Sequence, residues 1–103
     1  DRTLGPRIER TEVIRRLTSV PADFFGLADR GRLVPGAAAD LNVIDLDALS
    51  VRRPVVHHDL PAGGWRFLQP VSGYVATFVA GVQTRAQDAD TGQRPGRLVR
   101  RGA

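Results

Sequence analysis

The side chains best suited to chemistry in this chain are two histidines followed by an aspartate, His57, His58 and Asp59. Imidazole and carboxylate groups bind metal ions and transfer protons, so a metal site or a catalytic triad is the first hypothesis to weigh. Neighbouring residues of a strand face opposite sides, whereas a catalytic zinc ion needs three protein ligands that converge. A triad also needs a nucleophile, and none stands in a recognisable setting. We therefore interpret the three residues as part of a surface or loop.

A pair of glycines, Gly63 and Gly64, is the second group to consider, because glycine-rich loops let the backbone cradle a phosphate. Such loops follow a Gly-x-x-x-x-Gly-Lys pattern and lead into a helix. This loop has neither feature. We interpret it as a turn that precedes an extended segment containing Trp65 and Phe67.

Three aspartates, Asp40, Asp45 and Asp47, bracket a predicted strand. Paired carboxylates can serve as general acid and base, and Asp45 and Asp47 would share a face if the strand continued that far. We expect a structural role instead. In that interpretation Asp40 stabilises the entry to the strand, and the other two pair with arginines at its exit.

The charge of the chain suggests another class of function. All 15 basic residues are arginines, they exceed the 11 acidic residues, and the net charge is +4. Arginines bind phosphate groups, and four lie near the end of the sequence, at Arg94, Arg97, Arg100 and Arg101. A stand-alone basic module for nucleic acid is therefore one alternative. Because no aromatic residues are interleaved for base stacking, we expect solvated or aspartate-paired arginines and no nucleic-acid partner.

Composition limits what the remaining residues can form. A chain of 103 residues allows one small domain, and the absence of cysteine excludes disulfides, thiolate ligands and a thiol nucleophile. No apolar run approaches the roughly 20 residues of a membrane span, and no signal-peptide pattern is present. We expect a cytoplasmic protein without a membrane partner. The first residue is Asp1, so we also expect a processed product or a piece of a longer protein.

Helical periodicity is confined to the first third of the chain. Apolar residues recur at helical spacing over 11–20, with Thr11 as the expected N-cap and a break before Pro21. Pro21 can open a second short helix that ends at Gly26 in a left-handed cap. The aromatic pair Phe24 and Phe25 is expected to be buried against another part of the protein.

Extended structure is predicted from a Pro35-Gly36 turn onward. The strand at 41–46 carries apolar residues on both faces, which favours an interior position over a sheet edge. A short strand follows at 55–56. The strongest alternation runs over 74–85 and predicts a hairpin about Ala80-Gly81. Leu98 and Val99 could form one last strand.

The sequence resembles the C-terminal part of amidohydrolase-superfamily enzymes. The segments that carry the superfamily resemblance are TSVPADFFGL at 18–27, DRGRLVPG at 29–36 and ADLNVID at 39–45. Later segments are similar to the D-aminoacylase branch, the N-acyl-D-amino-acid deacylases: DLPAGG at 59–64, GYVAT at 73–77, GV at 81–82, TG at 91–92 and PGRLV at 95–99. Two positions depart from that branch. Ala80 stands where an asparagine is common, and Trp65 stands where related chains tend to be polar, which indicates an added packing or interface contact.

The resemblance implies a fold class and a division of the chain. Such enzymes combine a (β/α)8 barrel with a small β-sandwich built from both chain ends. The expected fold is therefore mainly β with an N-terminal helical segment. Residues 1–30 would be the last barrel helix leaving the barrel, and residues 31–103 would be the C-terminal half of the composite sandwich. The family's metal ligands and catalytic aspartate lie on barrel strands with no counterpart here, so no catalytic, cofactor-binding or metal-binding residue is expected, His57 and His58 included.

The resemblance also implies a function for the parent protein. It would be a metal-dependent hydrolase, with zinc as the implied metal, that cleaves N-acyl amino acids, the D-enantiomers being expected. The chain itself would be inactive and hold no cofactor. Its expected partner is the remainder of its own polypeptide, with self-association through strand edges or apolar surface as a further possibility. A cyclic amidase or deaminase of the same superfamily stays open, because substrate contacts in such barrels come from strand-end loops elsewhere.

Overall fold

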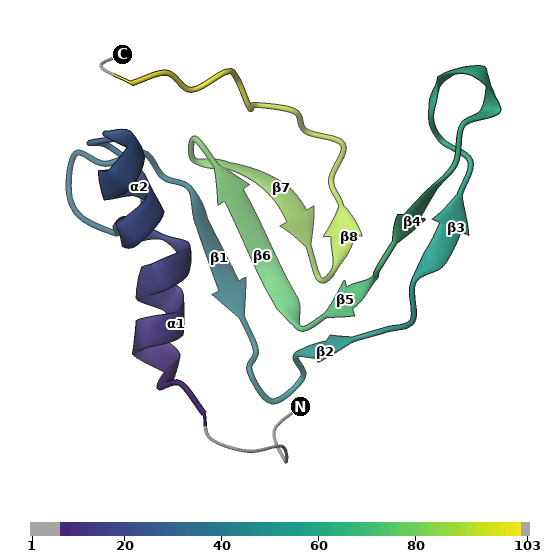
Figure 1. Cartoon of the computed structure of the whole chain (residues 1–103), viewed down its shortest axis with the longest axis horizontal. Helices are drawn as coiled ribbons and strands as arrows, with labels where there is room; N and C mark the ends of the chain where they lie inside the picture. The colour runs from purple at the N-terminus through teal and green to yellow at the C-terminus, as the bar shows by residue number, and fades with distance from the viewer. Residues whose placement is uncertain (1–6, 102–103) are drawn as a thin grey trace.

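Two helices stand beside an open array of strands in the computed structural model, which describes residues 7–101 (Figure 1). The helices are α1 (Arg10–Leu17) and α2 (Ser19–Phe25). The strands are β1 (Leu41–Ile44), β2 (Ser50–Val51), β3 (Val55–His57), β4 (Arg66–Leu68), β5 (Val71–Ser72), β6 (Tyr74–Val79), β7 (Val82–Ala86) and β8 (Ala89–Asp90). A 3-10 turn, Pro61–Gly63, joins β3 to β4. The prediction of a mainly β chain with an N-terminal helical segment is confirmed.

The two helices meet at Thr18 and not, as predicted, at Pro21. Thr18 has non-helical dihedral angles (φ −127°, ψ −80°), and its hydroxyl donates a 2.6 Å hydrogen bond to the carbonyl of Ile14. Pro21 lies in the first turn of α2, where backbone N–H groups have no helical partner, so proline is tolerated there. The expected N-cap at Thr11 is also wrong, because α1 begins at Arg10.

Local turn chemistry was predicted well. Gly26 ends α2 in the left-handed conformation (φ 70°), and the N–H of Leu27 bonds the carbonyl of Ala22 at 2.8 Å. Gly36 has a φ of 89° in a turn closed by a 3.1 Å bond from the N–H of Ala37 to the carbonyl of Val34. Both predictions are confirmed.

The strands form three antiparallel sheets. The largest has the order β1-β6-β7-β8, and the other two are the pairs β2-β5 and β3-β4. The hairpin between β6 and β7 turns at Ala80 and Gly81 as predicted, with positive φ at both residues (50° and 77°). The last strand of the sheet is β8 and not the predicted Leu98-Val99 segment, which is irregular.

Strand β1 is at the edge of the four-stranded sheet, so its predicted interior position is wrong for the described residues. It ends at Ile44, two residues earlier than predicted. Figure 1 places α1 and α2 on the far side of β1 from β6. No other strand in residues 7–101 pairs with that edge, so its backbone N–H and C=O groups have no strand partner there.

Very little of the described chain is buried. Ala22 and Ala76 are the only apolar side chains that are fully buried in residues 7–101, whereas Phe24 and Phe25 are 81% and 62% exposed. The accessible surface is 8487 Å², against roughly 5,700 Å² for a folded monomer of this mass. The Cα radius of gyration is 16.2 Å, against about 13 Å for a compact domain of this length. The described residues therefore hold secondary structure but almost no core of their own.

Within residues 7–101, no helix has the length and apolar character that crossing a membrane requires.

Candidate functional site

The histidine and aspartate cluster lies at the tip of a two-stranded arm formed by β3 and β4. Figure 1 shows this arm projecting from the side of the molecule opposite the helices. His57 is the last residue of β3 and pairs with Arg66 across the arm, and His58 and Asp59 follow in the connecting loop. All three side chains are exposed. The interpretation as surface residues agrees with this placement.

Asp59 is bound by an arginine and not by a histidine. Its carboxylate accepts two hydrogen bonds from Arg66, from Nε at 2.9 Å and from Nη2 at 2.7 Å. These bonds hold the pKa of Asp59 below its ordinary value of 3.8. The carboxylate therefore stays ionised and bound to Arg66 on the other side of the loop. This arrangement suits a structural role better than proton transfer.

The Asp59–Arg66 pair predicts a pH dependence for the tip of the arm. The folded pKa of Asp59 is lowered, so its contribution to stability is complete above pH 3.8 and is lost as the pH falls through the lowered value. A carboxyl carbon NMR titration is expected to give a midpoint below 3.8, and Arg66→Gln should return it to the ordinary value. A midpoint unchanged by Arg66→Gln would contradict the pair.

The cluster does not fit a metal ion. Across residues 7–101, histidine, aspartate and glutamate side chains form no group of three that could hold one. His57 and His58 are adjacent in sequence, and the nearest carboxylate is already paired with Arg66. The zinc implied for the parent enzyme therefore has no ligand set among the described residues.

The glycine pair forms a turn, as interpreted. Gly63 has a φ of 73°, and Gly64 closes the loop through a 3.2 Å bond from its N–H to the carbonyl of Pro61. Strand β4 follows and not a helix. The loop thus lacks the helix N-terminus on which a phosphate cradle depends.

The three aspartates have different roles. Asp40 binds the N–H of Ala80 at 2.8 Å through one oxygen and pairs with Arg30 through the other. It thereby ties the entry of β1 to the tip of the β6–β7 hairpin, as the predicted entry role requires. The expected arginine partners of Asp45 and Asp47 are both wrong. The Asp45 carboxylate accepts bonds from the N–H groups of Asp47 and Ala48 (3.1 and 3.4 Å) in the turn after β1, and the Asp47 carboxylate pairs with no arginine in residues 7–101.

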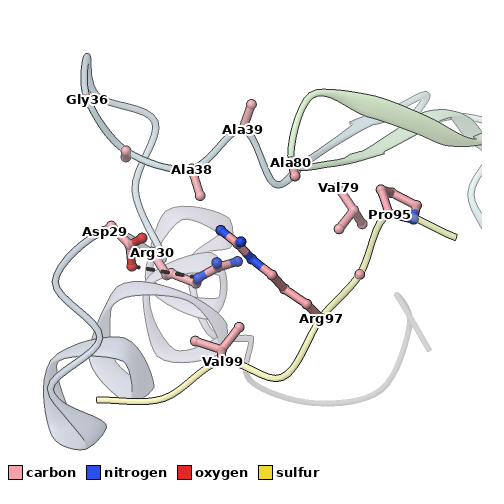
Figure 2. Close-up of a pocket in the computed structure, with 12 residues that line it drawn as sticks. Asp29, Arg30, Gly36, Ala38, Ala39, Val79, Ala80, Pro95, Arg97 and Val99 are labelled. Atoms are coloured by element: carbon pink, nitrogen blue, oxygen red, sulfur yellow. Dashed lines mark ion pairs between the residues drawn. The ribbon is translucent and has the colours of Figure 1, made fainter. Parts of the chain in front are cut away.

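A pocket of about 520 Å³ lies between the Gly36 turn, the β6–β7 hairpin tip and the C-terminal tail. Figure 2 shows the side chains of Arg30 and Arg97 pointing toward each other across it. The charge of Arg30 is already balanced by Asp40 and by Asp29, whose carboxylate is 3.6 Å from Arg30 Nε. No histidine, serine or cysteine lines this pocket in the described chain. The one carboxylate among the described lining residues, that of Asp29, lies beside Arg30.

Many of the arginines are paired with acidic side chains. Five carboxylates, those of Glu12, Asp23, Asp40, Asp59 and Asp90, each bind an arginine at hydrogen-bonding distance. In the tail, Arg94 binds Asp90 at 2.6 Å. Six arginines of residues 7–101 pair with carboxylates in this way, and Arg94 is the one member of the four predicted tail arginines that does so.

Comparison with known proteins decides the family. A family model described as the amidohydrolase family matches residues 1–85 of the sequence. The chain belongs to the amidohydrolase family. Within it, the chain is 34% identical over 108 residues to an N-acyl-D-glutamate deacylase from Alcaligenes xylosoxydans xylosoxydans, an alignment that covers 99% of this chain and 20% of that protein. The resemblance to the D-aminoacylase branch is thereby confirmed.

A second relative is similar to this member of the amidohydrolase family over a shorter stretch. It is a dihydroorotase from Lactiplantibacillus plantarum, 54% identical over 35 residues, which are 34% of this chain and 8% of that protein. The chain thus spans about a fifth of the deacylase, and its match to the dihydroorotase spans less than a tenth of that protein. No solved structure matches the chain.

Sequence reasoning missed two residues that organise this structure. The carboxylate of Asp88 accepts bonds from the N–H groups of Gly73 and Tyr74 (3.1 and 2.8 Å), so it joins the β7–β8 turn to the corner between β5 and β6. Gly73 occupies that corner with a φ of 105°. A single aspartate in a polar tail and a glycine before a strand gave no signal of this pairing.

Proposed function

We propose that this chain is the non-catalytic C-terminal portion of a metal-dependent amidohydrolase that hydrolyses N-acyl amino acids, with D-amino acids as the expected products. In this proposal the described residues position and support a catalytic body that lies upstream, and the body holds the zinc ion. Support comes from the family membership and from the similarity to an N-acyl-D-glutamate deacylase along nearly the whole chain.

The observation that carries the proposal is the excess surface. The chain exposes about 2,800 Å² more than a folded monomer of its mass, the difference between 8487 Å² and roughly 5,700 Å². A standard protein interface covers only about 800 Å² per partner. A large partner must therefore cover several faces of this chain at once. The remainder of the same polypeptide is such a partner.

One of these faces is the free edge of β1. A groove of about 460 Å³ runs between α1 and β1 and is lined by apolar side chains that include Ile14, Leu33, Leu41 and Ile44. An unpaired strand edge beside an apolar groove is a place where another strand can add. We assign this position to a sandwich strand from the upstream part of the polypeptide, so that residues 31–103 complete the sandwich.

A second face is formed by exposed apolar side chains of α1 and α2. Leu17, Phe24 and Phe25 are 72%, 81% and 62% exposed, and the two phenylalanine rings meet edge to face with centroids 5.0 Å apart. Apolar side chains this exposed normally mark a contact surface. In the proposal, residues 1–30 pack this surface against the barrel.

The 103-residue chain alone is expected to show no hydrolysis of N-acetyl-D-amino acids and no tight zinc binding. The physical reason is that its described residues provide neither three converging ligands nor an activated nucleophile. Product amine release and zinc content after dialysis against a chelator measure the two properties. A stoichiometric zinc ion that survives dialysis would contradict the proposal.

Two other functions remain as alternatives to this proposal. A cyclic amidase or deaminase of the same superfamily would use the same supporting segment, and assays of the longer polypeptide with cyclic amides distinguish it. A basic nucleic-acid module would show a salt-dependent electrophoretic shift with single-stranded or duplex nucleic acid. The family membership and the similarity to a deacylase along nearly the whole chain favour the amidohydrolase over this module.

A further inference from the structure

The β3–β4 arm has one aromatic face. In the antiparallel register Val56 pairs with Phe67, and Trp65 lies two residues before Phe67, so the three side chains share a side of the arm. The rings of Trp65 and Phe67 meet edge to face, with centroids 5.4 Å apart and an interplanar angle of 85°. Both rings are more than half exposed, at 57% and 62%.

Few contacts hold this arm in place: at its base the N–H of Arg52 bonds the carbonyl of Pro70 at 2.9 Å, and the Gln69 amide bonds the carbonyl of Arg52 at 3.1 Å. β3 and β4 pair only with each other within residues 7–101, and an isolated two-stranded hairpin is marginally stable in water. The Asp59–Arg66 pair joins the two ends of the loop at the tip. It is an exposed ion pair, so it contributes little to the stability of the arm. The arm therefore needs a surface that covers its aromatic face.

We propose that the β3–β4 arm docks its aromatic face, Val56, Trp65 and Phe67, into an apolar recess on the catalytic body of the same polypeptide. This inference rests on the proposed function, because that function supplies the body. It adds a third docking site, remote from the β1 edge and from the helices, and it assigns a role to Trp65.

The area of the aromatic face favours the catalytic body of the same polypeptide over a second copy of the chain as its partner. An aromatic side chain buries about 150–250 Å², so three side chains at the observed exposures offer on the order of 300 Å². A stable dimer needs about 800 Å² per partner. A partner tethered through the same chain needs less, since its effective concentration reaches the millimolar range.

Charged residues at the base of the arm indicate which groups should surround the recess. The guanidinium groups of Arg52 and Arg53, at the base of the arm before Pro54, form no ion pair in residues 7–101. The carboxylate at the tip, that of Asp59, is already bound to Arg66. Unpaired cations beside an apolar face favour a partner that offers carboxylates. The recess is therefore apolar at its centre and acidic where it meets the base of the arm.

Hydrogen–deuterium exchange read by mass spectrometry tests the docking. The 103-residue chain is compared with the longer polypeptide that contains the upstream body. Amides of β3 and β4 are expected to exchange about 100-fold more slowly in the longer polypeptide, because docking suppresses opening of the arm. Phe67→Ala should remove most of this slowing. Leu98→Ala, a change to a similarly exposed apolar side chain in the C-terminal tail, should leave the arm unaffected.

The outcomes separate the two proposals. If β1 and α2 slow in the longer polypeptide while the arm does not, the docking inference is overturned and the proposed function stands. If no segment slows, both fail. If the arm of the 103-residue chain slows as its concentration rises, a second copy covers the face, which also overturns the inference.

Discussion

Gly73→Ala is expected to destabilise the fold by about 3 kcal/mol or more. Gly73 is buried at the corner between β5 and β6 with a φ of 105°, which L-residues rarely adopt. A Cβ added there would lie 2.6 Å from Leu49 Cα and 2.8 Å from Leu49 N. Both are backbone atoms, so no side-chain rotation relieves the clash. The backbone around the corner would have to move.

The clash is costly because three segments meet at this corner. The carbonyl of Gly73 accepts a 2.8 Å bond from the N–H of Asp45, just after β1, and its N–H binds the carboxylate of Asp88. Displacing the corner therefore loosens the end of β1 and the β7–β8 turn together. Urea unfolding followed by circular dichroism measures the loss.

Gly63→Ala is the matched control for this prediction. Gly63 also has a positive φ of 73°, but an added Cβ meets nothing within 4 Å. Its cost is limited to backbone strain, about 1 kcal/mol. Equal losses for the two substitutions would show that strain alone, and not the contact with Leu49, makes Gly73 necessary.

The features that sequence predicted correctly are those set by two or three neighbouring residues. The turn at Pro35-Gly36 and the cap at Gly26 follow from the dihedral preferences of proline and glycine. The Ala80-Gly81 hairpin was placed by the alternation on either side, although alanine resists its φ of 50°. In each case the local chemistry allows few other conformations.

The features that sequence missed depend on partners distant along the chain. The aromatic pattern at Phe24 and Phe25 predicts burial, and both are exposed because the covering surface is absent from the described residues. The predicted interior position of β1 is wrong for the same reason, because no described strand pairs with its outer edge. Under the proposed function, these apolar patterns reflect contacts with the remainder of the polypeptide, which the described residues do not include.

The candidate site was harder to predict than the fold. The exposed placement of His57 and His58 could be predicted from local pattern, but the Arg66 partner of Asp59 follows from the register of β3 and β4, which the sequence does not display. The double role of Asp40 likewise requires a hairpin tip 40 residues away. Polar contacts between distant segments produce no repeating pattern in the sequence from which they could be predicted.

Asp40→Ala is expected to cost about 2 kcal/mol, because it removes a charge-assisted bond and a backbone bond at once. Asp40 pairs with Arg30, which is only 23% exposed, and it holds the N–H of Ala80 at the left-handed hairpin tip. Without the carboxylate, Arg30 keeps only the longer contact with Asp29, and the strained turn loses its anchor to β1. Urea unfolding of the variant measures the effect.

Two further variants divide the contribution of Asp40. Asp40→Asn keeps an acceptor for Ala80 but loses the ion pair, so about half of the stability should return. Asp47→Ala removes a carboxylate that binds no arginine in residues 7–101 and should change stability by less than about 0.5 kcal/mol. If Asp40→Ala were as mild as Asp47→Ala, Asp40 would be a solvated surface residue. The hairpin tip would then owe its position to the bond between the Gly81 N–H and the Ala39 carbonyl alone.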